Sequence, residues 1–150
     1  MSETRNFIPI FVYGSLKTGF GNNGILRNGM ANRVGLATTV DDYFMFSLGG
    51  YPGVIDSGFS PDKGKPIFGE LWMVNEKTLR ALDLLESNGS LYERKLTDIH
   101  YYDSTKNEFA ADRAWMYFYL HDLEDAIEND ARGRIGHTVA ADSIYEWVKN

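Results

Sequence analysis

The sequence predicts an α+β protein, with a small, mixed but mostly antiparallel β-barrel flanked by a few helices. Segments rich in β-branched and aromatic residues outnumber the segments that have helical periodicity. Turns that carry glycine or proline separate most of these strand-like segments. Few of the segments alternate with helices in the order that builds a parallel sheet, so antiparallel pairing is expected.

The predicted strands begin close to the N-terminus. The apolar run at residues 7–12 is followed by a glycine-containing loop at residues 13–19. Further strands are expected at residues 33–40, 42–48, 66–74, 92–102 and 113–120. Residues 49–53 are a strong turn signal, because glycine supplies unusual dihedral angles and proline fixes one. A polar turn near residues 103–107 should join the last two strands.

One segment has strong helical periodicity. Asn75 is a good N-cap for this helix, and an Asn-Gly pair at residues 88–89 is a usual C-terminal signal. Two shorter helices are predicted at residues 123–129 and 142–148. No repeat or linker divides the chain, so residues 1–150 are expected to form one domain.

A carboxylate lies on the apolar face of the periodic helix. Leu79, Leu82 and Glu86 are spaced i, i+3 and i+7, which aligns them along one stripe that Leu85 widens. A glutamate in such company loses water, and its pKa rises because the charged form is disfavoured. Such a carboxyl can take and return a proton near neutral pH. The alternative is that Glu86 reaches water from a frayed last turn, and Asp83 is expected to be a solvated or capping carboxylate.

The loop after the first strand is a candidate ligand site. A glycine-containing turn at a strand's end releases backbone N–H groups, which form a partly positive concavity for a small anionic or carbonyl-bearing ligand. Together with Glu86, this loop suggests an enzyme that handles a small molecule by acid–base chemistry. Ser15 lacks the G-x-S-x-G context of a nucleophile, so it is expected to support the turn or contact the ligand.

Composition excludes several classes of protein. The chain has no cysteine, which excludes disulfides, thiolate catalysis and thiolate metal sites. A formal net charge of -6 argues against nucleic acid as the main partner. No apolar run is long enough to cross a bilayer and no secretory signal is visible, so a cytoplasmic protein is expected. The histidines are scattered at positions 100, 121 and 137, and no metal site is expected.

Residues 19–24 match the G-x-G-x-x-G fingerprint of dinucleotide-binding proteins. The context does not fit, because the fingerprint should open a helix directly after the strand. Here five residues separate Tyr13 from Gly19, and the segment that follows is soon broken by Gly29. A nicotinamide-dependent oxidoreductase is therefore a minor alternative.

Several stretches together resemble the gamma-glutamylcyclotransferase-like family, in that family's order and over most of the chain. They are FVYGSLKTG at 11–19, YPGV at 51–54, FGELW at 68–72, LDLLE at 82–86 with YER at 92–94, and AWMY at 114–117. The opening loop is moderately specific by itself and considerably more so together with the L-D-x-x-E…Y-x-R stretch. The form YGSLK looks closer to the small branch that acts on γ-glutamylamines.

The resemblance implies a small mixed β-barrel and intramolecular aminolysis, an amide-cleaving reaction that closes 5-oxoproline and expels an amine or amino acid. It implies that Glu86 is the general acid/base and that neither a metal nor a cofactor is needed. The γ-glutamyl substrate would be bound by Tyr13, Gly14, Ser15 and Leu16, with Tyr92 as a further binding residue.

Three points stay open at this stage. The leaving group could be an amino acid, a thiol peptide, a polyamine or an isopeptide lysine, and the oligomeric state is not indicated. The turn at residues 57–65 and the acidic C-terminal portion have no assigned counterpart, and they would shape the leaving-group side or contact a partner. A binding module that holds a small ligand or a protein on the same fold, without catalysis, is the alternative function.

Overall fold

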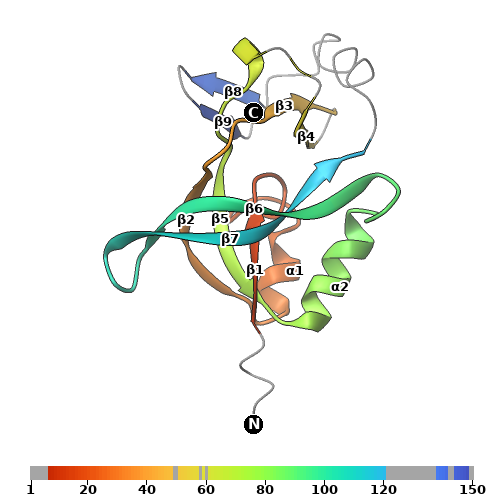
Figure 1. The fold of residues 1–150 in the computed structure, drawn as a ribbon. Helices are drawn as coiled ribbons and strands as arrows, with labels where there is room; N and C mark the ends of the chain where they lie inside the picture. The colour runs from red at the N-terminus through yellow and green to blue at the C-terminus, as the bar shows by residue number, and fades with distance from the viewer. Residues whose placement is uncertain are drawn as a thin grey trace.

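A five-stranded barrel forms the centre of the molecule in the computed structural model, which describes residues 7–48, 51–57, 59, 61–120, 138–141 and 144–148. The barrel strands are β1 (Ile8–Val12), β2 (Asn32–Thr39), β5 (Phe68–Val74), β6 (Tyr92–Asp103) and β7 (Glu108–Tyr119). They close in the order β1-β5-β2-β6-β7 (Figure 1). Strands β1 and β7 run parallel, whereas the other neighbours are antiparallel. The predicted mixed, mostly antiparallel barrel is confirmed.

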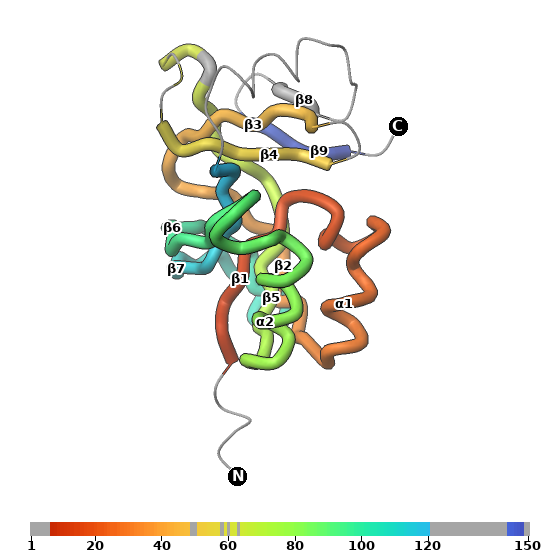
Figure 2. Tube along the Cα trace, turned by 90° about the vertical axis from the view of Figure 1, so that its right-hand side faces the viewer, coloured from red at the N-terminus to blue at the C-terminus, as the bar shows by residue number. Residues whose placement is uncertain are grey.

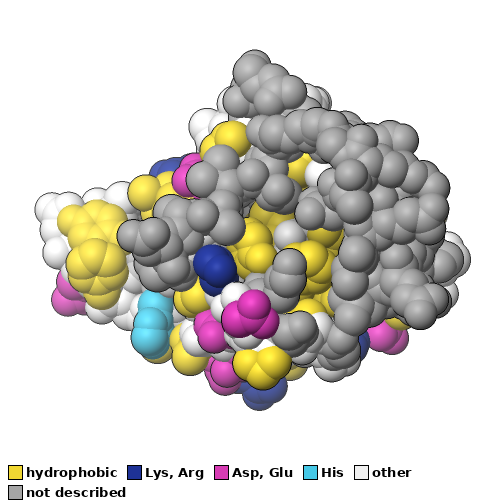
Figure 3. Space-filling view, turned by 90° about the horizontal axis from the view of Figure 1, so that it is seen from above, with side chains coloured by type: hydrophobic (Ala, Val, Ile, Leu, Met, Phe, Trp, Pro, Cys, Tyr) yellow, Lys and Arg dark blue, Asp and Glu magenta, His cyan; other side chains and the backbone are white. Residues whose placement is uncertain are grey.

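Two small hairpins lie over one end of the barrel, opposite the end at which β1 begins (Figures 1 and 2). They are β3–β4 (Phe44–Ser47 and Pro52–Ile55) and β8–β9 (Thr138–Ala141 and Ile144–Trp147), and a short 3-10 helix, η2, spans Pro61–Lys63. Strand β9 is attached to the barrel because the Tyr145 N–H donates to the Pro66 carbonyl at 2.9 Å. Hydrophobic side chains gather in a hollowed part of this face (Figure 3).

Two helices, α1 (Asn23–Asn28) and α2 (Glu76–Leu85), pack beside the barrel (Figure 2). Helix α2 begins as predicted, because the Asn75 side chain accepts a hydrogen bond from the Thr78 N–H at 2.8 Å. Its Leu79 and Leu82 side chains are buried against the barrel. No helix in the described ranges is long and apolar enough to span a membrane.

The C-terminal end of α2 differs from the prediction. The helix ends at Leu85, with Glu86 as its C-cap, rather than near residues 88–89. Ser87 adopts a left-handed conformation with φ of 50°, which ends the helix before the Asn-Gly pair is reached. Glu86 therefore lies at the junction between the helix and the loop that leads to β6.

Four other predictions need correction or fall outside the described residues. The predicted helix at 142–148 is wrong, because residues 144–147 form β9 with Tyr145 and Trp147 buried in a period of two. The 49–53 turn is wrong in part, because Pro52 and Gly53 pair with β3. The last barrel strand begins at Glu108, since the long β6–β7 ladder continues as far as the turn. The predicted helix at 123–129 lies outside the described residues.

Candidate active site

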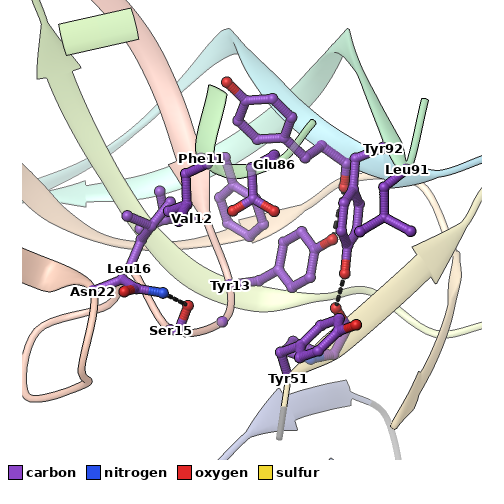
Figure 4. A pocket seen from close by; sticks show the side chains of 14 residues that line it. Phe11, Val12, Tyr13, Ser15, Leu16, Asn22, Tyr51, Glu86, Leu91 and Tyr92 are labelled. Atoms are coloured by element: carbon purple, nitrogen blue, oxygen red, sulfur yellow. Dashed lines mark hydrogen bonds between the residues drawn. The ribbon is translucent and has the colours of Figure 1, made fainter. Parts of the chain in front are cut away.

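A cavity of about 380 Å³ lies where the loop after β1, the end of α2 and the starts of β4 and β6 meet (Figure 4). Its wall is mostly aliphatic and aromatic, with a few polar groups. The lining residues are Phe11, Val12, Tyr13, Gly14, Ser15, Leu16, Asn22, Tyr51, Pro52, Leu85, Glu86, Leu91, Tyr92 and Tyr117. A concave apolar site with few polar groups is the usual form of a small-molecule site.

Glu86 is the carboxylate in this wall. Leu82 and Leu79, one and two turns earlier on the same face of α2, are buried and set the side of the helix that faces the barrel. The Glu86 carboxylate makes no hydrogen bond or ion pair with the part of the chain that the structure describes, and it points into the cavity beside Tyr13 (Figure 4). Burial raises the pKa of Glu86 to about 7, because the charged form has lost water without gaining a partner.

The loop after β1, which lines the cavity beside Glu86, is held by its own hydrogen bonds. The Lys17 N–H donates to the Gly14 carbonyl at 3.0 Å, and the Asn22 N–H donates to the Ser15 carbonyl at 2.9 Å. The Asn22 amide also donates to the Ser15 hydroxyl at 2.8 Å, so Ser15 supports the turn. Within the described residues the N–H groups of Gly14, Ser15 and Leu16 donate to no other group. Unpaired amides in a wall of this kind can stabilise a developing oxyanion.

Three tyrosines surround Glu86, and each donates its hydroxyl proton elsewhere. The Tyr13 hydroxyl donates to the Tyr117 carbonyl at 2.7 Å, and the Tyr92 hydroxyl donates to the Pro52 carbonyl at 2.7 Å. The Tyr117 hydroxyl donates to a carboxylate oxygen of Asp83 at 2.6 Å. Burial raises the pKa of all three phenols, and the nearby Glu86 charge raises each of them further. They therefore stay protonated, while Glu86 is the group that can exchange a proton near neutrality.

Asp83 is not the solvated or capping carboxylate that the sequence predicts. Its two oxygens accept from Nε and an amino nitrogen of Arg94, at 2.7 and 3.2 Å, and both side chains are only 22% exposed. The Arg94 guanidinium also lies over the Trp115 ring, 4.5 Å from its centre. Asp83 is thus part of a fixed ionic contact between α2 and β6.

The far end of the loop is anchored by a second carboxylate, Glu70 on β5. It accepts from the Thr18 N–H at 2.9 Å, the Thr18 hydroxyl at 3.1 Å and the Trp72 indole N–H at 3.0 Å. Its other oxygen lies 3.6 Å from Nε of Arg33. These contacts fix the position of the loop on the barrel wall.

The G-x-G-x-x-G stretch belongs to no dinucleotide-binding unit. It runs into the start of α1, a helix of only six residues. The next strand, β2, pairs with β5 and β6 rather than returning parallel to β1. Among the described residues, no three His, Asp or Glu side chains are grouped so that they could hold a metal ion.

The structure brings all of the sequence-predicted site residues to one cavity. Glu86, Tyr92 and the loop at residues 13–16 all line it. Sequence reasoning did not assign Tyr51 and Tyr117 to the site, although both lie within stretches that resemble the family. It also missed the Asp83–Arg94 contact, for which the only signal was that both residues belong to the L-D-x-x-E…Y-x-R stretch.

Comparisons with known proteins agree with this arrangement. The family described as "Gamma-glutamyl cyclotransferase, AIG2-like" matches residues 10–136. The gamma-glutamylcyclotransferase family protein YtfP of Escherichia coli K12 is 36% identical over 115 residues, which cover 77% of this chain and 85% of that protein. The gamma-glutamylaminecyclotransferase of Bos taurus is 37% identical over 91 residues, 57% of this chain and 52% of that protein.

A solved structure shares the fold. The crystal structure of an AIG2-like protein from Mus musculus superposes with a TM-score of 0.67 at 25% identity, over 81% of this chain and 83% of that one. The family match spans the loop after β1, Glu86 and Tyr117, and so includes the cavity described above. The chain belongs to the gamma-glutamyl cyclotransferase, AIG2-like family.

Proposed function

We propose that this protein is a γ-glutamyl cyclotransferase that releases 5-oxoproline and a free amine or amino acid, with Glu86 as its general acid/base. The observation that carries the proposal is the Glu86 carboxylate, which lies without a partner among the described residues in an apolar cavity and has a pKa of about 7. A carboxyl of this kind exchanges protons at neutral pH. Family membership supports the same reaction class.

The first step transfers a proton from the substrate to the enzyme. The α-ammonium of the γ-glutamyl group gives a proton to the Glu86 carboxylate, which frees the nitrogen lone pair. The amine nitrogen then attacks its own side-chain carbonyl carbon and forms the N–C bond of a five-membered ring. Because nucleophile and electrophile belong to one molecule, the cavity has only to select the folded conformer.

The second step returns the proton. The carbonyl oxygen carries the negative charge in the tetrahedral intermediate. The N–H groups of Gly14, Ser15 and Leu16, which line the cavity and donate to no other described group, would stabilise it. The bond from carbon to the leaving nitrogen breaks as the Glu86 carboxylic acid protonates that nitrogen. The ring nitrogen still carries two hydrogens, and it gives one of them as a proton to the Glu86 carboxylate, which passes it to the departing amine. The products are 5-oxoproline and the amine as its ammonium form, and Glu86 is again a carboxylate.

The site also supports a prediction for the leaving group's position. The loop and Glu86 occupy one side of the cavity, and the exposed Tyr51 and Leu85 side chains lie at its rim. The leaving group would therefore extend toward Tyr51 and Leu85. The name of the bovine relative, gamma-glutamylaminecyclotransferase, makes γ-glutamylamines one class of substrate to test.

The direct test is to incubate the purified protein with a panel of γ-glutamyl dipeptides and γ-glutamylamines and to measure 5-oxoproline by mass spectrometry. Glu86→Gln removes the proton acceptor while keeping the side-chain shape, so turnover should fall about 10²–10⁴-fold. For the wild type, kcat should fall as the pH drops below about 7, since Glu86 becomes protonated.

Two results would contradict the proposal. One is near-normal turnover by the Glu86→Gln variant. The other is a lack of 5-oxoproline from every member of the panel, while γ-glutamyl compounds still raise the melting temperature. The second result would indicate a binding module that keeps the cavity but has no catalytic activity.

A further inference from the structure

We propose that Asp83 is a positioning residue for Glu86: through Arg94 and Tyr117 it ties the last turn of α2 to β6 and β7, and so holds the Glu86 carboxylate at the cavity. The inference rests on the proposed function only for the role of Glu86 in turnover. The geometric part concerns the folded protein and can be measured without a substrate.

We call the contacts of Asp83 with Arg94 and Tyr117 the tie. Its ionic part, the Asp83–Arg94 ion pair, has good geometry. Asp83 and Arg94 meet in a two-point contact, and the guanidinium is stacked on Trp115. A planar two-point contact with both side chains mostly out of water is stronger and more directional than an exposed ion pair. Asp83 lies three residues before Glu86, so it controls the turn from which the Glu86 side chain projects.

Two hydrogen bonds of Asn88 fix the chain on the C-terminal side of Glu86. The Asn88 N–H donates to the Asp83 carbonyl at 2.9 Å, and the Asn88 side-chain oxygen accepts from the Arg94 N–H at 3.0 Å. The chain thus leaves Asp83, passes through Glu86 and Ser87, and is fixed again at Asn88. Both ends of this short segment are connected to Arg94, which leaves the Glu86 side chain little freedom to turn outward.

Tyr117 extends the tie to the opposite wall of the cavity. Its hydroxyl donates to Asp83, and its backbone carbonyl accepts from the Tyr13 hydroxyl. Asp83 therefore also keeps the Tyr117 hydroxyl engaged, so that this donor is not offered to Glu86. The catalytic carboxylate stays without a hydrogen-bond donor from the described residues, which is the state that keeps it a good base.

Helix α2 carries a second ion pair that serves as a matched control. Glu76 and Arg80 lie 2.8 Å apart on the first turns of the helix, and their side chains are 75% and 65% exposed. This pair joins two residues of α2 to each other and reaches no strand. The control variant Glu76→Gln removes one negative charge from α2, as Asp83→Asn does. It leaves the contacts of the turn that carries Glu86 intact.

The groups that face Glu86 determine how the test is read. Tyr13, Tyr51, Tyr92 and Tyr117 come from the loops and strands around the cavity, and Asp83 and Arg94 lie behind the α2 turn. If Asp83 and Arg94 acted on Glu86 only through their charges, removing the anion would lower its pKa and removing the cation would raise it. If they act as a tie, removing either one lets water reach Glu86 and lowers its pKa.

The experiment is a ¹³C NMR titration of the protein labelled at the glutamate side-chain carboxyl, with the Glu86 signal assigned from the Glu86→Gln variant. Asp83→Asn, Arg94→Met and the control Glu76→Gln are compared with the wild type. We expect the first two variants each to lower the pKa of Glu86 by about one unit and the control to leave it unchanged. In the panel assay, kcat of both tie variants should fall about tenfold with a smaller change in KM.

Opposite pKa shifts in Asp83→Asn and Arg94→Met, or no shift in either, would overturn the proposal. Circular dichroism shows whether each variant folds, and if Asp83→Asn does not, the sign of the Arg94→Met shift decides alone. The two proposals fail separately. Parallel pKa shifts in a protein that releases no 5-oxoproline would support the tie and reject the proposed function.

Discussion

Glu70 and Glu86 are two carboxylates at opposite ends of one loop. Glu70 is buried and Glu86 is half-buried, and they differ in the contacts that they make. Glu70 is 6% exposed and has acceptor contacts with Thr18 and Trp72, with Arg33 close by. Glu86 is somewhat more exposed, yet its carboxylate has no partner among the described residues. Burial by itself therefore does not mark a catalytic carboxylate.

The two carboxylates differ in the presence or absence of hydrogen-bond donors among the described residues, and this difference fits a structural role for Glu70 and the proposed catalytic role for Glu86. A satisfied carboxylate holds its neighbours in place and contributes to stability. An unsatisfied one costs stability when it is charged, and the same cost makes it ready to accept a proton. Both kinds of carboxylate lie at this loop: Glu70 fixes the position of the loop, and Glu86 would carry out the proposed chemistry beside it.

The largest expected effect comes from deleting Glu70. The Glu70→Ala substitution leaves the buried Trp72 indole N–H without an acceptor and removes the acceptor of the Thr18 N–H, and should cost about 4 kcal/mol of unfolding free energy. The matched Glu86→Ala substitution leaves no hydrogen-bond donor of the described residues without an acceptor, and it should cost far less. Urea unfolding of the two variants measures the difference, and equal losses would show that the two carboxylates do not differ in this way.

A smaller effect is expected from the charge on Glu86. Its pKa rises from about 4.5 unfolded to about 7 folded, so the stability that its protonated form contributes is complete below pH 4.5 and is lost as the pH rises through 7. Glu86→Gln should therefore be more stable than the wild type by about 2 kcal/mol at pH 8 and equal to it at pH 4. Unfolding midpoints at both pH values test this, and a gain that is the same at pH 4 would point to a cause other than ionisation.

The smallest effect is expected at Gly14, where the loop meets β4. A Cβ atom on this residue would lie 2.8 Å from Cγ of the Pro52 ring, so Gly14→Ala should push the loop away from the cavity wall. We expect a loss of about 1–2 kcal/mol of stability together with a rise in KM. Melting curves and initial rates with the best substrate of the panel measure both. An unchanged KM would mean that the loop does not position the substrate.

The fold class and the candidate acid/base could be predicted from the sequence because their signals are local. Asn75 caps α2 through a contact three residues away, and the helical period places Glu86 beside Leu79 and Leu82. The strand-like composition of the barrel segments is likewise visible in short windows. The predicted end of α2 was too late because Ser87 already adopts a positive φ, two residues before Gly89 does.

The tertiary structure alone decided which distant residues meet at the cavity. Tyr13 and Tyr117 are hydrogen-bonded across 104 residues of chain, and this contact depends on β1 closing the barrel against β7. The same closure brings Tyr117 to Asp83. The sequence determined that Glu86 would leave water, because helical periodicity is a local property. That its tyrosine neighbours donate elsewhere is a property of barrel closure, which no local pattern encodes.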